Sequence, residues 1–239
     1  MGMLQLKLVR VPGVVGIYGP TKDQFPPRMS YLQVAASEAF QKASAALKLR
    51  VSDMFRTADE SLRARATKKG VQPPGYSAHN YGLAIDIDTD AALASNKFNK
   101  VALDRAMESF GWWCHRKDGL RGMEDWHYNY LGVFAEADPF LSIAARSTVR
   151  SAAIEAKIVQ TFGNDLLLTP EEAQIALARM KFYHGEIDGT FGNGSKEALK
   201  AFQRAWGLSE SGSLDARTER TLAFVSAEIL EIRPKVSHS

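Results

Sequence analysis

The chain has 239 residues, of which 45% are hydrophobic and 24% are charged. These values are typical of a folded protein with one or two domains, and they exclude a chain that is disordered throughout. The formal net charge is +3, well short of the strongly basic surface of a dedicated nucleic-acid binder, so we expect no nucleic-acid partner. Cys114 is the only cysteine, which excludes an intramolecular disulfide.

The sequence contains no apolar run long enough to span a bilayer. The early apolar stretch, residues 11–17, is broken by proline and glycine and makes a poor secretory signal. We therefore expect synthesis in the cytoplasm without a signal peptide, and no stable membrane insertion.

The first third of the chain predicts two helices with a strand between them. Residues 30–49 place apolar side chains at helical spacing after the Pro26-Pro27 pair, which predicts an amphipathic helix. Residues 51–55 predict a strand, and residues 58–69 predict a second helix that ends at Gly70.

The next segments carry the polar residues of most interest. Residues 83–88 alternate apolar and polar side chains, which predicts a half-buried strand with Asp86 on its polar face. A helix is expected over residues 96–110, a loop containing Trp112 to Cys114 follows, and residues 125–130 predict an aromatic-rich strand.

A separate helical unit is expected at the C-terminal end. Thr169 as N-cap, Pro170 in the first helical position and Glu172 two residues later form a capping-box start. Turn signals then separate this helix from one that ends at Gly207 and from another that begins near Asp215. We therefore predict a first domain over 1–148, a helical linker over 149–164 and a three-helix domain over 165–230.

Two imidazoles and one carboxylate suggest a metal site. His79, Asp86 and His127 would supply three ligands to Zn²⁺ and leave a fourth position open for chemistry. Zinc in such a site polarises a carbonyl and lowers the pKa of water. Glu124, three residues before His127, could accept a proton as a base, and Arg56 could stabilise an oxyanion or bind a substrate carboxylate.

Spacing alone leaves a structural interpretation open. A single histidine or aspartate is more often a structural group than a ligand, and this is not the compact His-Glu-x-x-His pattern. Ser77 and Asp88 could hold the ligands through hydrogen bonds, or could be ordinary polar groups of turns and strand ends. The ligand types favour zinc without separating it from other divalent ions.

Two motifs make the hydrolase interpretation more specific. They are Ser77-x-His79-x-x-Gly82-x-Ala84-x-Asp86 and Glu124-x-Trp126-His127. Together they resemble the VanY-like family of zinc peptidases, which contains D-Ala-D-Ala carboxypeptidases and L-Ala-D-Glu endopeptidases, with the endolysins of bacteriophages especially similar. The resemblance implies an α+β fold of the hedgehog and D-Ala-D-Ala peptidase type, with a small antiparallel sheet flanked by helices.

The resemblance also implies roles for individual residues. It makes His79, Asp86 and His127 the metal ligands and Glu124 the base, and Arg56 of the Phe55-Arg56-Thr57 segment matches an assisting arginine. Family members often carry a glutamine about five residues after that arginine, where this chain has Ser61. That substrate contact is therefore not expected here.

A second resemblance covers the C-terminal helices. Asp188-Gly189 and Phe202-Gln203, within residues 174–222, resemble the peptidoglycan-binding domain at the ends of many cell-wall hydrolases. It implies that this unit holds the protein on the bacterial wall and raises the local concentration of substrate.

The sequence therefore predicts a zinc metallopeptidase of the endolysin type that cuts peptidoglycan stem peptides, with the L-Ala-D-Glu bond preferred. The alternatives are a D-Ala-D-Ala carboxypeptidase and a non-catalytic wall-binding protein whose zinc site is structural. We expect a monomer whose partner is peptidoglycan, and which acts on the wall in the periplasm after release from the host cytoplasm.

Overall fold

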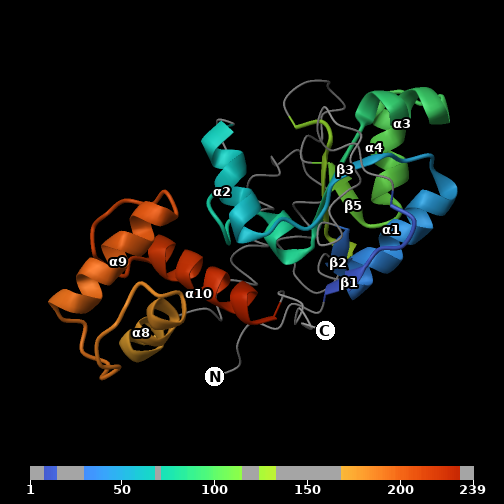
Figure 1. The fold of residues 1–239 in the computed structure, drawn as a ribbon. Coiled ribbons are helices and arrows are strands. Elements are labelled where there is room, and N and C mark those ends of the chain that lie inside the picture. The colour runs from blue at the N-terminus through green and yellow to red at the C-terminus, as the bar shows by residue number, and fades with distance from the viewer. Residues whose placement is uncertain (1–7, 15–29, 68–70, 115–123, 133–167, 232–239) are drawn as a thin grey trace, which may run out of the picture. The chain divides into compact units, whose positions relative to one another are not determined.

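A computed structural model describes residues 8–14, 30–67, 71–114, 124–132 and 168–231. The described residues form two compact units (Figure 1). The first, here called the sheet unit, contains those of 6–56 and 78–159. The second, here called the helical unit, contains those of 57–77 and 160–239. No helix in the described part of the chain is long and apolar enough to cross a membrane.

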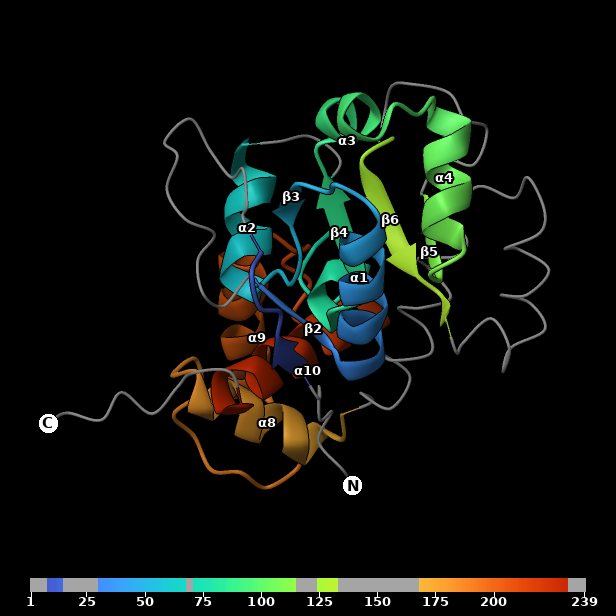
Figure 2. The ribbon, with the colours of Figure 1, turned by 90° about the vertical axis from the view of Figure 1, so that its right-hand side faces the viewer.

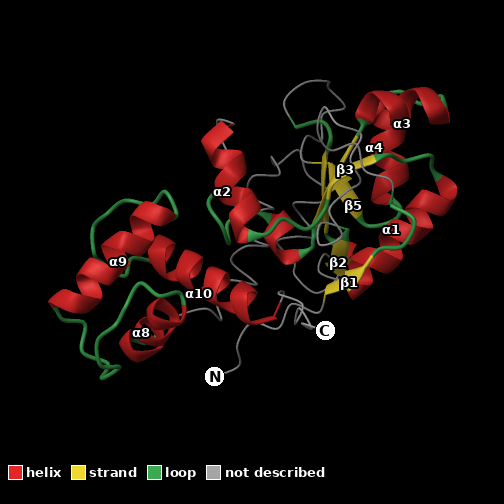
Figure 3. Cartoon of the chain, in the orientation of Figure 1, coloured by secondary structure: helices red, strands yellow, loops and turns green. Residues whose placement is uncertain are grey.

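The sheet unit contains two antiparallel sheets (Figure 3). The smaller one pairs β1 (Leu8–Arg10) with β2 (Tyr31–Gln33). The larger one has the strand order β3-β4-β6-β5 and consists of β3 (Val51–Asp53), β4 (Ala84–Ile87), β6 (His127–Tyr130) and β5 (Trp112–Cys114). The predicted α+β class with a small antiparallel sheet is therefore confirmed.

Helices flank the larger sheet. They are α1 (Val34–Ala46), α3 (Thr89–Asn96), α4 (Lys100–Glu108) and the short 3₁₀ helix η1 (Ala78–Tyr81). Helices α1 and α4 lie on one face of the sheet (Figures 1 and 2). On that face the ring of Phe40 from α1 meets the buried ring of Trp112 edge-on, with centroids 6.4 Å apart. This contact fixes the helix against the edge strand β5.

Three segments differ from the sequence-based prediction. Residues 31–33 form a strand, so the predicted 30–49 helix begins only at Val34. The predicted loop at Trp112–Cys114 is wrong, because these residues pair with β6. The helix expected over 96–110 is shorter, since α3 ends at Asn96 and α4 begins after Asn99, whose side chain accepts a hydrogen bond from Ala102 N.

The helical unit contains α2 (Ala58–Thr67), α8 (Pro170–Arg179), α9 (Asn193–Ala205) and α10 (Ala216–Glu231). The predicted capping box is present: Thr169 Oγ1 accepts from Glu172 N, and Glu172 Oε2 accepts from Thr169 N. The side chains that form the apolar core of these helices are Leu177, Leu199, Phe202, Leu222 and Phe224.

Residues 57–77 belong to the helical unit, although they stand between two segments of the sheet unit. Thr221 of α10 donates from Oγ1 to the carbonyl of Pro74 over 3.2 Å, and Arg65 donates to the carbonyl of Gly207 over 3.2 Å. The domain boundaries predicted from sequence stay a prediction, and the linker expected over 149–164 lies outside the described residues. This packing could not be predicted from local sequence patterns, because it joins segments about 140 residues apart.

Candidate metal centre

The pairing of β4 with β6 brings two of the predicted ligands together. Asp86 and His127 are directly opposite each other in the register, so their side chains lie on the same face of the sheet. The next residue, Tyr128, points to the other face, where its hydroxyl donates to Asp104 of α4 over 2.7 Å. Asp86 and His127 therefore lie on the face opposite to α4.

The third predicted ligand, His79, lies on η1, which leads into β4 through Gly82. Gly82 has a left-handed φ of 64°, and a Cβ there would lie 2.5 Å from Leu8 Cδ2 and 3.0 Å from Gln33 N. Glycine is thus needed at this position, and the neighbour that requires it is the β1–β2 sheet.

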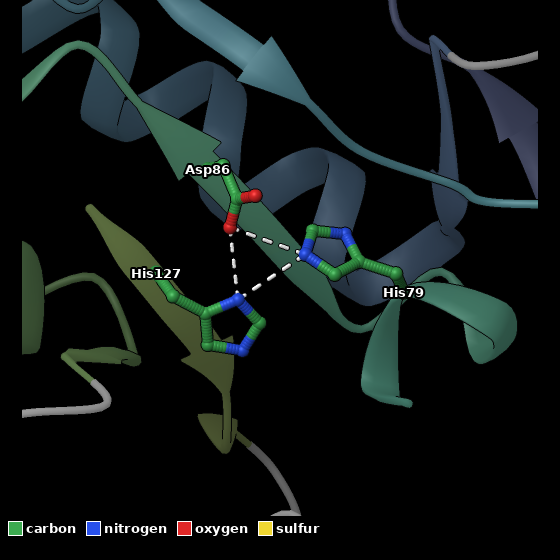
Figure 4. Close-up of side chains that lie close together, drawn as sticks. All are labelled: His79, Asp86 and His127. Atoms are coloured by element: carbon green, nitrogen blue, oxygen red, sulfur yellow. Dashed lines mark hydrogen bonds and ion pairs between the residues drawn. The ribbon is translucent and has the colours of Figure 1, made fainter. Parts of the chain in front are cut away.

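The three side chains converge on one point (Figure 4). His79 Nε2 lies 3.1 Å from Asp86 Oδ1 and 3.1 Å from His127 Nδ1, and the latter atom lies 2.8 Å from Asp86 Oδ1. Both histidines are buried. In the described part of the chain these residues form a group of metal-binding type, with one donor atom from each.

Outer hydrogen bonds fix the orientation of both imidazole rings. His79 Nδ1 bonds to the carbonyl of Met54, and His127 Nε2 lies 3.2 Å from the side-chain oxygen of Asn129. Both partners are acceptors, so each of these nitrogens must donate. In a neutral imidazole the other nitrogen then carries a lone pair, which here points toward Asp86. Three lone pairs within 3.1 Å of one another repel unless a cation lies between them.

The donor set fits a zinc ion. Zn²⁺ binds imidazole nitrogen and carboxylate oxygen at about 2.0–2.2 Å, which separates neighbouring ligands of a tetrahedral site by about 3.4 Å. The observed separations of 2.8–3.1 Å are slightly shorter. A small outward movement of the three side chains would accommodate the ion, and the outer hydrogen bonds to Met54 and Asn129 match the supporting contacts that metal-bound histidines usually make.

The charges in the cluster perturb two of its pKa values. Burial raises the pKa of Asp86, but the nearby His79 and His127 lower it by more, so that it lies well below its usual range. Burial lowers the pKa of His79, but the Asp86 and Asp53 carboxylates together raise it by more. The charges of the cluster therefore favour a positive charge at this position.

Arg56 lies beside the cluster and is held by a carboxylate that the sequence analysis missed. Its Nε donates to Asp53 Oδ2 over 3.0 Å and its Nη2 bonds to the same oxygen, while Nη2 lies 3.9 Å from Asp86 Oδ2. Burial raises the pKa of Asp53, opposed by the charge of Arg56. The pair could have been predicted from the opposite charges of Asp53 and Arg56, which stand three residues apart in Asp53-Met54-Phe55-Arg56.

The remaining predicted residues are placed as follows. Glu124 is exposed in the turn before β6, with a left-handed φ of 62°, and its carbonyl accepts from His127 N over 3.2 Å. Asp88 caps α3 by accepting from Ala91 N and lies 3.9 Å from Arg50, so its described contacts do not reach the cluster. Ser77 is buried just before η1, and Ser61, which replaces the glutamine of the family, is buried in α2.

Comparison with known proteins identifies two regions. The family model for "D-alanyl-D-alanine carboxypeptidase", VanY, matches residues 32–133. The model for "Putative peptidoglycan binding domain" matches residues 170–222. No curated protein matches the chain.

Among solved structures, one match is the LdcB LD-carboxypeptidase, reported to reveal the molecular basis of peptidoglycan recognition. It is 18% identical, with a TM-score of 0.42, and the match covers 62% of this chain and 78% of that chain. The region that matches the VanY model contains all three members of the His79–Asp86–His127 cluster, so the chain resembles a VanY-like peptidase with a C-terminal peptidoglycan-binding domain.

Proposed function

We propose that the chain is a zinc-dependent peptidase that hydrolyses the stem peptides of bacterial peptidoglycan. The observation that carries the proposal is the set of three inward-facing donor atoms of His79, Asp86 and His127, all within 3.1 Å of one another. The VanY match over the same residues and the peptidoglycan-binding match further along the chain support the substrate class.

The side chains around the cluster would divide the work of hydrolysis. When bound, Zn²⁺ supplies Lewis-acid activation of the scissile carbonyl and of the attacking water. Glu124 would accept the proton of that water and pass it to the leaving amine. Arg56, held by Asp53, would place positive charge near the oxyanion of the tetrahedral intermediate. Met54 and Asn129 would keep the imidazoles in the tautomers that present lone pairs inward.

The bond we propose is the one between L-Ala and D-Glu. A domain that holds the enzyme on the intact wall suits an enzyme that cuts within stem peptides, because every such cut releases a stem from its glycan strand. The same arrangement suits a lytic enzyme of the endolysin type. A second candidate is removal of the terminal D-Ala, which the description of the matched carboxypeptidase family favours.

Mass spectrometry of digested wall separates these two activities. Purified peptidoglycan is incubated with the protein and the soluble products are identified. Stem peptides that begin at D-Glu support the endopeptidase, whereas free D-Ala with shortened stems supports the carboxypeptidase and overturns the proposed bond.

The metal requirement is tested in the same digestion. We expect a chelator to abolish product formation and added Zn²⁺ to restore it. Binding of zinc without cleavage of any peptidoglycan type would contradict the enzymatic proposal and would favour a wall-binding protein with a structural metal site.

A further inference from the structure

The helical unit has a cationic site built from two distant segments. Residues 73–75 are buried, and a Cβ at Gly75 would lie 3.2 Å from Phe224 Cβ of α10, so this segment packs closely on the helix. The next residue, Tyr76, donates from its hydroxyl to the carbonyl of Ala216 over 3.3 Å. The Tyr76 ring is therefore held against the first turns of α10.

Two arginines of α10 lie over this ring. The guanidinium of Arg220 is 4.9 Å and that of Arg217 is 5.8 Å from the ring centroid of Tyr76. The two arginines are three residues apart, so they project from the same side of the helix. Contact with one aromatic ring orients both guanidiniums and lowers the entropy they would lose on binding a ligand.

Neither guanidinium forms an ion pair with a carboxylate of the residues that the structure describes. Within the residues that the structure describes, Arg217 and Arg220 have the contact with Tyr76 but no hydrogen bond or ion pair of their side chains. The acidic side chains near the start of α10 accept hydrogen bonds from backbone amides. Asp215 accepts from the amides of Arg217 and Thr218, and Glu219 accepts from Leu168 N. Two oriented planar donor groups are thus available to an anion.

We propose that Tyr76, Arg217 and Arg220 form the wall-contact site of the helical unit and bind the carboxylates of peptidoglycan stem peptides. The inference rests on the proposed function, from which it takes peptidoglycan as the substrate, and it identifies the surface that binds this substrate. Both arginines lie within the region matched by the peptidoglycan-binding family. The sugars of peptidoglycan offer carboxylates mainly through their attached peptides, and a planar guanidinium matches a carboxylate with two parallel hydrogen bonds.

Binding to purified wall tests the proposal. The full chain is used with Glu124→Gln as a background, so that the wall is not digested, and the fraction retained on peptidoglycan freed of teichoic acid is measured. We expect Arg217→Gln with Arg220→Gln to weaken retention by about tenfold or more. Arg179→Gln, which removes an exposed arginine at the end of α8, is the matched control and should bind as the parent does.

Chemical blocking of the wall tests the ligand separately. Conversion of the stem carboxylates to methylamides should weaken binding of the parent as much as the double variant does, and Arg220→Lys should restore only part of the loss. Equal binding by the double variant and the Arg179 control would overturn the site. Equal binding to free and amidated wall, or retention that requires the phosphates of teichoic acid, would overturn the carboxylate assignment.

The assay measures binding without turnover, so its outcome is independent of the peptidase proposal. Loss of the wall contact in the double variant would stand even if the chain cleaved no bond. If the chain is an active peptidase and the double variant still binds wall, the proposed function stands and this surface is not the wall-contact site.

Discussion

His127 and Asn129 lie two residues apart on β6, on the same face of the strand, and the imidazole Nε2 donates to the Asn129 side-chain oxygen over 3.2 Å. The two residues are buried. This bond makes Nδ1 the nitrogen that faces Asp86 and His79, so a residue outside the predicted ligand set determines how one ligand is presented.

Replacement of Asn129 by alanine should weaken zinc binding by about 10–100-fold, because the His127 ring loses the contact that fixes its tautomer and orientation. Competition with a chromophoric chelator at constant pH measures the affinity. Asn193→Ala, at an exposed position of α9, is the control. Unchanged zinc affinity in Asn129→Ala would show that the bond does not position the ligand.

Zinc affinity should rise with pH. The pKa of His79 is raised above its ordinary value of 6.5, so a proton competes with the metal for Nε2 until the pH exceeds the raised value. Each proton released on binding changes the affinity by about tenfold per pH unit. Isothermal titration calorimetry between pH 5 and pH 8 measures this slope. A flat profile would contradict the assignment of His79 as a ligand.

The metal-free protein should show a different pH dependence. Protonated His79 contributes stability that is fully present below 6.5 and is lost as the pH rises through its raised pKa. Asp86 contributes stability that is present above 3.8 and is lost as the pH falls through its lowered pKa. Thermal melts with a chelator should therefore show a maximum between these two values, and added zinc should stabilise the protein most at higher pH.

Glu124→Gln should retain zinc and lose at least about a hundredfold in turnover, because the glutamine amide cannot accept a proton. Glu38→Gln, an exposed position on α1, is the matched control and should be fully active. Muropeptide release measures turnover, and metal analysis measures zinc content. Normal turnover by Glu124→Gln would remove Glu124 from the mechanism.

Asp53→Ala should lower the free energy of unfolding by about 3 kcal/mol, because it leaves the largely buried Arg56 without its carboxylate. The double variant with Arg56→Ala should recover part of this loss, since the buried charge is removed together with the carboxylate that holds it. Urea unfolding of the single and double variants measures the difference. If the two losses were simply additive, the pair would contribute no coupling energy.

The ligand cluster could be predicted from the sequence because its signals are local. The alternation around Asp86 predicts a strand, and the two motifs place His79 and His127 at either side of it. In the structure the antiparallel pairing of β4 with β6 places Asp86 opposite His127. The capping box of Thr169 and Glu172 is equally local, and the structure confirms it.

Other features depend on contacts between distant segments, which a single sequence does not display. Residues 31–33 share the apolar pattern of the following helix, yet hydrogen bonds to β1 make them a strand. Trp112–Cys114 resembles a loop between glycines until it pairs with β6. Asn129 has no motif of its own, and its role appears only once its side chain is seen beside His127.

Anomalous diffraction at the zinc edge, from crystals of the zinc-loaded protein, tests the central claim most directly. A single ion should appear about 2.0–2.2 Å from His79 Nε2, Asp86 Oδ1 and His127 Nδ1. Zinc bound at any other position, with these three atoms left without a metal, would contradict the account.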